Sequence, residues 1–81
     1  MKALVHVTTK PDVLDPQGKA IAHAASQLGY EAIEKVRQGK LFEIDVAAAS
    51  EAEARALITE LCEKLLANPV IEDYEIVKIE G

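Results

Sequence analysis

Several residue types and features are scarce or absent in this 81-residue sequence, which has one cysteine, no tryptophan and no long apolar run. The single Cys62 excludes a disulfide within the chain, and together with the scattered His6 and His23 it gives no metal-ligand spacing. No apolar stretch approaches the roughly 20 residues that span a bilayer, and the N-terminus lacks the apolar core of a signal peptide. We therefore expect a cytoplasmic protein without a membrane anchor.

Basic side chains are also in the minority, with 9 Lys and Arg against 14 Asp and Glu and a net charge of −5. An acidic chain is not expected to bind nucleic acid or an anionic membrane. A domain of this size buries only about 60–65% of the surface that its unfolded chain exposes. Small domains without disulfides or metals commonly gain stability from partner subunits. Residues 1–81 are therefore predicted to form a single domain that associates as a homodimer or a tetramer.

The first half of the chain predicts a strand, a helix and a second extended region. Residues 2–8 alternate as in a strand, and Asp15 followed by Pro16 is typical of an N-cap with proline at the first helical position. Gly29 can end that helix in the left-handed conformation. Residues 32–46 are predicted to be extended with a break at Gly39-Lys40, either a hairpin turn or a bend in one strand, and a turn or sharp bulge is preferred. The apolar stripe of this helix consists of Ile21, Ala24, Ala25 and Leu28.

The second half predicts a longer helix and a final strand. Ser50 and Glu53 form a capping box in which the Ser50 hydroxyl accepts from the Glu53 amide and the Glu53 carboxylate reaches back to the Ser50 amide. An apolar stripe then continues for about 17 residues. Asn68-Pro69 ends this helix because Pro69 cannot continue it. The last strand, 74–79, carries apolar side chains on both faces.

This order of elements predicts an α+β fold, a two-layer β-α-β(-β)-α-β arrangement of the ferredoxin-like type. Two helices are expected on one face of a mostly antiparallel sheet. The other face then exposes apolar residues that a second copy of the chain could cover. Those residues are Leu4, Leu41 and either Tyr74 with Ile76 or Val77 with Ile79.

No set of catalytic residues emerges from the sequence. Gly18-Lys19 lies at a helix start, but Ala20 replaces the Ser or Thr of a phosphate-binding loop and no glycine stands five residues before Gly18. Cys62 lies on the apolar stripe of the second helix, where a thiol acts as a small apolar group. We expect no cofactor to be bound by this chain and no free-standing enzyme activity.

A cluster of three basic residues, Lys35, Arg37 and Lys40, is unusual in so acidic a chain. Such charges can protect an exposed sheet edge from aggregation. Alternatively, they form a docking surface for an acidic patch or for a phosphorylated ligand held by a larger partner.

Two blocks of the sequence resemble the PurS family, the small subunit of phosphoribosylformylglycinamidine synthase. One block is Val13-Leu14-Asp15-Pro16-Gln17-Gly18-Lys19-Ala20, and the other is Cys62-Glu63-Lys64-Leu65-Leu66-Ala67-Asn68-Pro69-Val70-Ile71-Glu72. Leu28-Gly29, Val36-Arg37-Gln38-Gly39-Lys40, Glu43-Ile44 and Tyr74 extend the likeness over nearly the whole chain. Asp12, where the family often has glycine, and Phe42 are slight departures from the pattern.

The resemblance implies a non-catalytic subunit of a synthase of purine biosynthesis that uses ATP and magnesium in another subunit. It implies three kinds of partner: further copies of the chain, a large synthase subunit and a glutaminase subunit whose ammonia must be passed on. The runner-up hypothesis is a dimeric ferredoxin-like regulatory domain that binds a small ligand such as an amino acid. Within the resembling segments, the candidate partner-interface residues are Asp15, Gln17, Arg37, Lys40, Asn68 and Tyr74.

Overall fold

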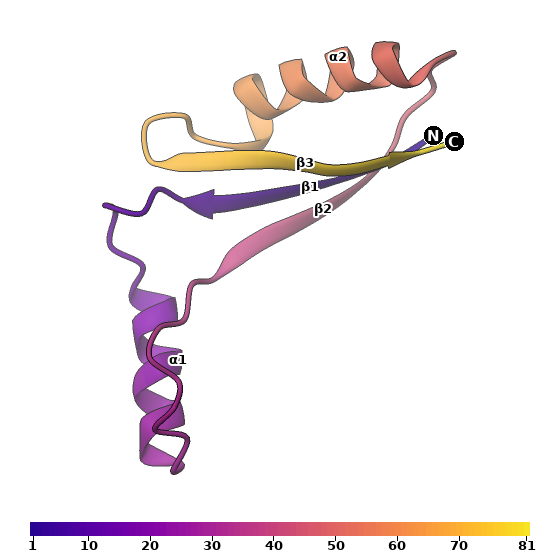
Figure 1. The fold of residues 1–81 in the computed structure, drawn as a ribbon. Coiled ribbons are helices and arrows are strands. Elements are labelled where there is room, and N and C mark those ends of the chain that lie inside the picture. The colour runs from indigo at the N-terminus through magenta and orange to yellow at the C-terminus, as the bar shows by residue number, and fades with distance from the viewer.

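The computed structural model describes residues 1–81 and contains a three-stranded antiparallel sheet, two α-helices and one π-helical turn (Figure 1). The sheet has the strand order β2-β1-β3, and both neighbouring pairs are antiparallel. The predicted α+β class and the β-α-β-α-β order are therefore confirmed. No helix has the length and apolar character needed to cross a membrane. The elements are β1 (Lys2–Thr9), α1 (Pro16–Gln27), β2 (Gly39–Asp45), α2 (Glu51–Leu61), η1 (Cys62–Leu66) and β3 (Glu72–Glu80).

The core lies between the sheet and α2 and is small, since only 8 of the 81 residues are buried. Alternate residues of β1, namely Ala3, Val5 and Val7, point toward Ile58 and Cys62 on the helical side. Half-buried side chains of β2 and β3 complete the contact around them. The opposite face of the sheet, which carries Leu4 and His6, is not covered by any helix (Figure 1).

A bulge in the β1–β3 pairing determines which apolar residues of β3 face the core. The register shifts between Leu4 and Val5, so Ile76 and Ile79 both pack on the core although they are three residues apart. Tyr74 packs on the same core, whereas Val77 remains 51% exposed. The sequence predicted that either Tyr74 with Ile76 or Val77 with Ile79 would face away from the helices. Neither pair does so, because only Val77 lies outside the core.

The second long helix extends as far as predicted, but its end and its cap differ in detail. The Ser50 hydroxyl accepts from the Glu53 amide at 3.2 Å as expected, whereas the Glu53 carboxylate accepts from the Ala49 amide at 3.1 Å and not from Ser50. The helix ends in η1, where the Ala67 amide donates to the Cys62 carbonyl at 3.0 Å. This wider last turn lets the chain turn back toward β3.

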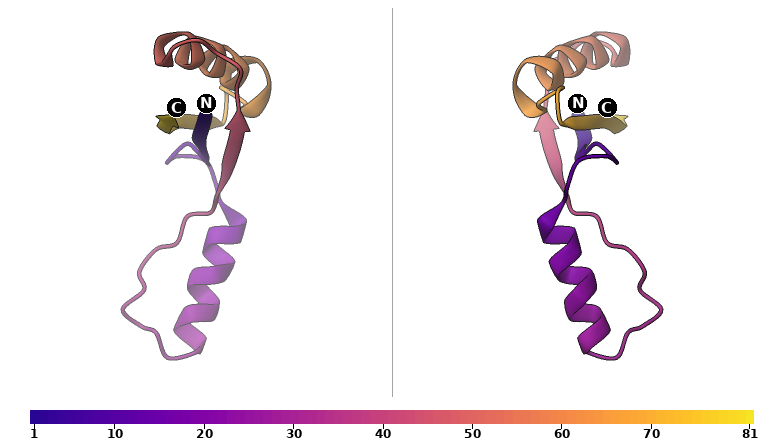
Figure 2. Two further views of the ribbon diagram at one scale, coloured as in Figure 1. Left: turned by 90° about the vertical axis from the view of Figure 1, so that its right-hand side faces the viewer. Right: turned by 90° about the vertical axis from the view of Figure 1, so that its left-hand side faces the viewer.

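The position of α1 differs from the expectation that both helices share one face of the sheet. In Figure 1, α1 stands off the end of the sheet, on the side opposite α2. It lies beside residues 29–38, which return to the sheet without regular structure (Figure 2). We call residues 10–38 the lobe. The lobe gives the molecule an elongated form, 50 × 26 × 13 Å.

Residues 32–38 do not form a strand, and the break at Gly39-Lys40 is neither a hairpin turn nor a bulge. Gly39 is the first residue of β2 and pairs with Thr8. A side chain at position 39 would lie 2.7 Å from both the Thr8 side chain and the Val7 carbonyl oxygen. Glycine is therefore required here by the close approach of β1, and the sequence pattern alone did not distinguish this from a turn.

Candidate partner interface at the junction of sheet and lobe

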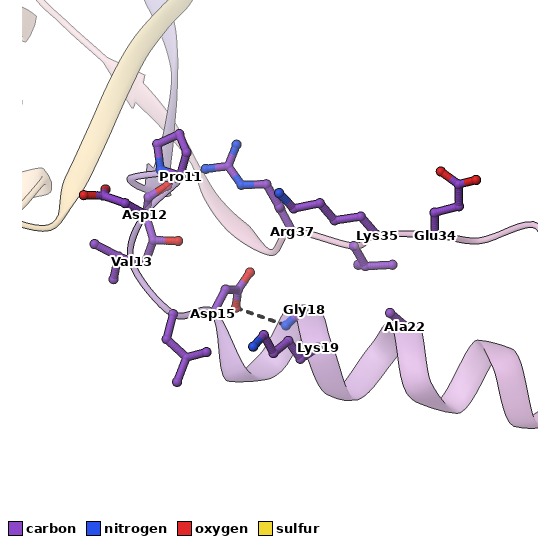
Figure 3. A pocket seen from close by; sticks show the side chains of 13 residues that line it. Pro11, Asp12, Val13, Asp15, Gly18, Lys19, Ala22, Glu34, Lys35 and Arg37 are labelled. Carbon is purple, nitrogen blue, oxygen red and sulfur yellow. Dashed lines mark hydrogen bonds between the residues drawn. The ribbon is translucent and has the colours of Figure 1, made fainter.

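The Asp15 side chain ties the start of α1 to the end of the lobe. Its Oδ1 accepts from the Gly18 amide at 3.0 Å (Figure 3), which confirms the predicted N-cap. Its Oδ2 accepts from the Gln38 amide at 2.9 Å. The Gln38 and Gly18 hydrogen bonds favour the charged carboxylate and lower the pKa of Asp15. One ionised side chain therefore holds two backbone segments together.

Gly18 allows α1 to approach the returning segment of the lobe. It is the one buried residue of α1. A Cβ built on Gly18 would lie 2.2 Å from the Val36 carbonyl oxygen, so no other residue fits without movement of the backbone. The neighbour that approaches so closely is the backbone of Val36. This contact and the Asp15 bonds keep α1 against residues 36–38 and away from the sheet.

Arg37 connects the lobe to the sheet, because its Nη2 donates to the Thr9 carbonyl at the end of β1. Together with Lys35 and Lys19 it lines a cavity of about 450 Å³ between α1 and the returning segment. Figure 3 shows the side chains of Lys35 and Arg37 extending in the same direction, while Glu34 points away from α1. Neither Lys19 nor Lys35 forms a salt bridge.

A second, smaller cavity of about 230 Å³ brings three of the predicted residues together. Asp15, Gln17 and Lys40 line it, with Thr9 and Glu72 on its other walls. Four of the six predicted residues, counting Arg37, therefore meet where β1 ends and β2 begins. Glu72 belongs to this site and was not among the predicted residues.

Asn68 organises the turn between η1 and β3. Its amide donates to Glu72 Oε1 at 2.8 Å, and its Oδ1 accepts from the Val70 amide at 3.1 Å. Its carbonyl accepts from the amides of Ile71 and Glu72 at 3.1 and 2.7 Å. The turn is joined to the start of the lobe by the Lys10 amide, which donates to the Ile71 carbonyl at 2.8 Å. Asn68 thus acts through the shape of this turn.

Tyr74 lies in β3, two residues after Glu72, and its side chain faces η1 at the end of the second helix. Its hydroxyl donates to Glu63 Oε1 at 3.2 Å. Desolvation and the Glu63 carboxylate both raise the pKa of Tyr74. Tyr74, Glu63 and Glu72 line a third open cavity. Glu72 borders this cavity and the one beside Lys40, so it links the two groups of predicted residues.

Comparison with known proteins identifies the family. The family model described as PurS: Phosphoribosylformylglycinamidine (FGAM) synthase matches residues 2–80. The chain belongs to the PurS family. A PurS-family relative from Archaeoglobus fulgidus, a phosphoribosylformylglycinamidine synthase subunit PurS, is 48% identical over 77 residues, which are 95% of this chain and 96% of the relative.

Solved PurS structures share the fold. PurS of Bacillus subtilis in a C2 crystal form is similar with a TM-score of 0.86 and 44% identity, over 99% of this chain and 98% of that one. A chain in the structure of PurLQS from Thermotoga maritima is similar with a TM-score of 0.85 and 28% identity, over 98% of this chain and 99% of that one. The resemblance to PurS stated from the sequence is therefore confirmed, and the extended arrangement agrees with PurS structures over nearly their whole length.

Proposed function

We propose that this chain is the small subunit of phosphoribosylformylglycinamidine synthase and works in purine biosynthesis. The observation that carries the proposal is the match to PurS proteins over nearly the full length of both chains. The alternative, a ferredoxin-like domain that binds an amino acid, is not favoured by any of these matches.

Within the synthase, the proposed role is non-catalytic. The chain bridges the large synthase subunit and the glutaminase subunit, so that ammonia passes between them without loss. ATP and magnesium are used by the complex, and no cofactor is bound by this chain. In support, the polar groups of the junction are engaged in holding backbone segments: Asp15 binds two amides, Asn68 organises a turn and Arg37 binds the Thr9 carbonyl.

The proposed partners are further copies of the chain, as a dimer or a tetramer, and the two larger subunits, all in the cytoplasm. The junction is the proposed surface for the larger subunits, because Gln17 and Lys40 are exposed there and extend from a framework fixed by hydrogen bonds. A surface that is ordered before binding loses less conformational entropy on association.

Reconstitution of the synthase tests this function. Large subunit and glutaminase subunit from the same organism should form formylglycinamidine from glutamine efficiently only when this chain is added. With ammonium chloride in place of glutamine, the large subunit should depend on the chain much less, because no transfer between subunits is required. A glutamine-dependent rate that is the same with and without the chain would contradict the proposal. Calorimetric titration with amino acids checks the alternative.

A further inference from the structure

The larger cavity of the lobe, between α1 and the returning segment, gathers positive charge in an acidic chain. Lys19 extends from α1, Lys35 and Arg37 extend from the returning segment, and all three line the same space of about 450 Å³ (Figure 3). Lys10 is the only other lysine or arginine of the lobe. Sites for small molecules have volumes of about 300–1,000 Å³. The cavity therefore has the size of a small-molecule site and a local concentration of cations.

The cations of this cavity have donors that the chain itself does not use. Neither Lys19 nor Lys35 takes part in a salt bridge. Arg37 forms one hydrogen bond, from Nη2 to the Thr9 carbonyl, which leaves its other N–H groups free to donate. The same bond holds the Arg37 side chain in place before any ligand arrives. A group that is already fixed loses less conformational entropy on binding.

The acidic side chains that line the cavity do not cancel this charge. In Figure 3, the carboxylates of Asp12 and Glu34 point away from α1. The Asp15 carboxylate is already engaged, because its two oxygens accept the Gly18 and Gln38 amides. These two amides compensate part of its negative charge. The groups that remain free to meet a ligand in the cavity are therefore mainly cationic.

One wall of the cavity is apolar. Pro11, Val13 and Leu14 form this wall in the segment that leads into α1. Leu14 is 64% exposed, so the wall is open to a ligand from solvent. An apolar wall beside a few charged groups is typical of a site for an organic molecule that carries its charge at one end.

We propose that this cavity binds a small phosphate monoester, such as a sugar phosphate or a nucleoside monophosphate, with the phosphate among Lys19, Lys35 and Arg37 and the organic part against the apolar wall. A phosphate monoester carries about 1.5 to 2 negative charges at neutral pH and has three terminal oxygens, which suit three cations from two segments. A carboxylate has two oxygens, which the fork of one arginine can satisfy alone. The phosphate is recognised here by side chains, since the sequence lacks a phosphate-binding loop.

Such a ligand is not a cofactor of the synthase reaction, and its binding is independent of the subunit role. A phosphate held by Lys19 and Lys35 joins α1 to the returning segment. It adds a link to those made by Asp15 and Gly18. A ligand stabilises the conformation that it binds in proportion to its occupancy. Occupancy of the cavity thereby couples the order of the lobe to the concentration of a phosphorylated metabolite.

Titration of the full chain with ribose 5-phosphate, followed by amide chemical shifts in NMR spectra, tests the inference. The changes should centre on residues 19–22 and 34–37, which line the cavity from both sides. Ribose should cause no change, because it lacks the phosphate. Inorganic phosphate should bind severalfold more weakly, because it lacks the organic part. With AMP as a second probe, tighter binding than that of ribose 5-phosphate assigns a base to the apolar wall, and equal binding assigns a sugar to it.

A double variant, Lys19→Gln with Lys35→Gln, removes two of the three cations and leaves the bond from Arg37 to Thr9 intact. Its dissociation constant for ribose 5-phosphate should be about tenfold higher or more, because two charge-assisted hydrogen bonds are lost. Lys2→Gln with Lys64→Gln, in β1 and η1, changes the net charge equally and should bind as the wild type does. The NMR spectra of both variants also show whether they are folded.

Four results would each overturn the inference. They are shift changes centred outside the cavity, no binding of ribose 5-phosphate at millimolar concentration, equal affinity for inorganic phosphate, and a control that weakens binding as much as the cavity variant does. None of these results bears on the glutamine-dependent activity of the reconstituted synthase, which remains a separate test of the subunit role.

Discussion

Asp15 and Gln38 lie 23 residues apart in the sequence, yet the Asp15 carboxylate accepts a hydrogen bond from the Gln38 amide with an N–O distance of 2.9 Å. The same carboxylate caps α1 through the Gly18 amide. The two ends of the lobe are therefore closed by one side chain, just before the chain re-enters the sheet at Gly39. Because the lobe has almost no buried residues, we expect these two hydrogen bonds to contribute strongly to its ordered conformation.

Removal of this carboxylate should loosen the lobe. In Asp15→Ala, hydrogen exchange at the Gln38 and Gly18 amides should become faster, because both lose their acceptor. Asp12→Asn is a matched control, since Asp12 lines the same cavity without accepting either bond. Unchanged exchange at Gln38 in Asp15→Ala would show that the hydrogen bond does not hold the lobe.

The same carboxylate predicts a dependence on pH. The folded-state pKa of Asp15 is lowered, chiefly by the Gln38 hydrogen bond. Its contribution to stability is thus present above the pKa of the unfolded chain, about 3.9, and is lost as the pH falls through the folded-state value. Protection of the Gln38 amide, followed by NMR, should decrease at acid pH in the wild type. Asp15→Asn should show lower protection near neutral pH and less change on acidification.

Gly18→Ala should separate α1 from the returning segment of the lobe. The added Cβ would lie 2.2 Å from the Val36 carbonyl oxygen, and relief of that overlap requires movement of the backbone. Overpacking of this kind costs about 1–3 kcal/mol, which exchange at amides 36–38 should report as easier local opening. Gly29→Ala serves for comparison, because nothing lies within 4 Å of its Cβ and only the backbone φ of 95° is strained. Equal protection at 36–38 in Gly18→Ala and wild type would refute the close contact.

Cys62 should be structural. It is fully buried between α2 and β1, and burial raises the pKa of its thiol, so little thiolate forms at neutral pH. Cys62→Ala should lower the free energy of unfolding by about 1 kcal/mol in urea titrations. Glutamine-dependent activity of the reconstituted synthase should remain nearly intact. Loss of turnover in a folded variant would instead assign the thiol a functional role.

Lys40 and Arg37 should contribute to docking of the large subunit. Lys40→Glu should slow association and make it less dependent on salt, because an exposed charge acts mainly on the rate of encounter. Arg37→Glu should have a stronger effect, since it also removes the bond to the Thr9 carbonyl. Lys64→Glu, the same change of charge on η1, is the control. If Lys40 only protects the edge of the sheet, solubility will change and affinity for the large subunit will not.

The sequence predicted those parts of the fold that depend on local residues. Pro16 after Asp15, the Ser50 cap and Asn68-Pro69 mark ends of helices through short-range chemistry, and each lies where expected. The position of α1 could not be predicted, because its stripe of alanines with Ile21 and Leu28 suits a sheet of its own chain or of another equally well. The bulge in the β1–β3 pairing was also hidden, since an alternating pattern does not reveal an inserted residue.

The candidate site was predicted in part for a similar reason. Asp15 was identified as a helix cap. Its second hydrogen-bond partner is the backbone amide of Gln38, and the sequence cannot predict this bond because every residue except proline has such an amide. Glu72 was not predicted to belong to the site. The signal that could have identified Glu72 is its position four residues after Asn68. A side chain at that distance can accept a hydrogen bond from the Asn68 amide at the start of the tight turn.

The antiparallel pairing of Thr8 with Gly39 makes the whole lobe the loop of a β-hairpin. In topological terms, residues 10–38 are an insertion between two adjacent strands, and a short turn could join the same strands directly. Closing a long loop costs more chain entropy than closing a short one. The lobe therefore makes the free energy of forming the β1–β2 pair less favourable than a short turn would. The lobe adds this entropic cost without adding a residue to the hydrophobic core, which the sheet forms with α2 and η1.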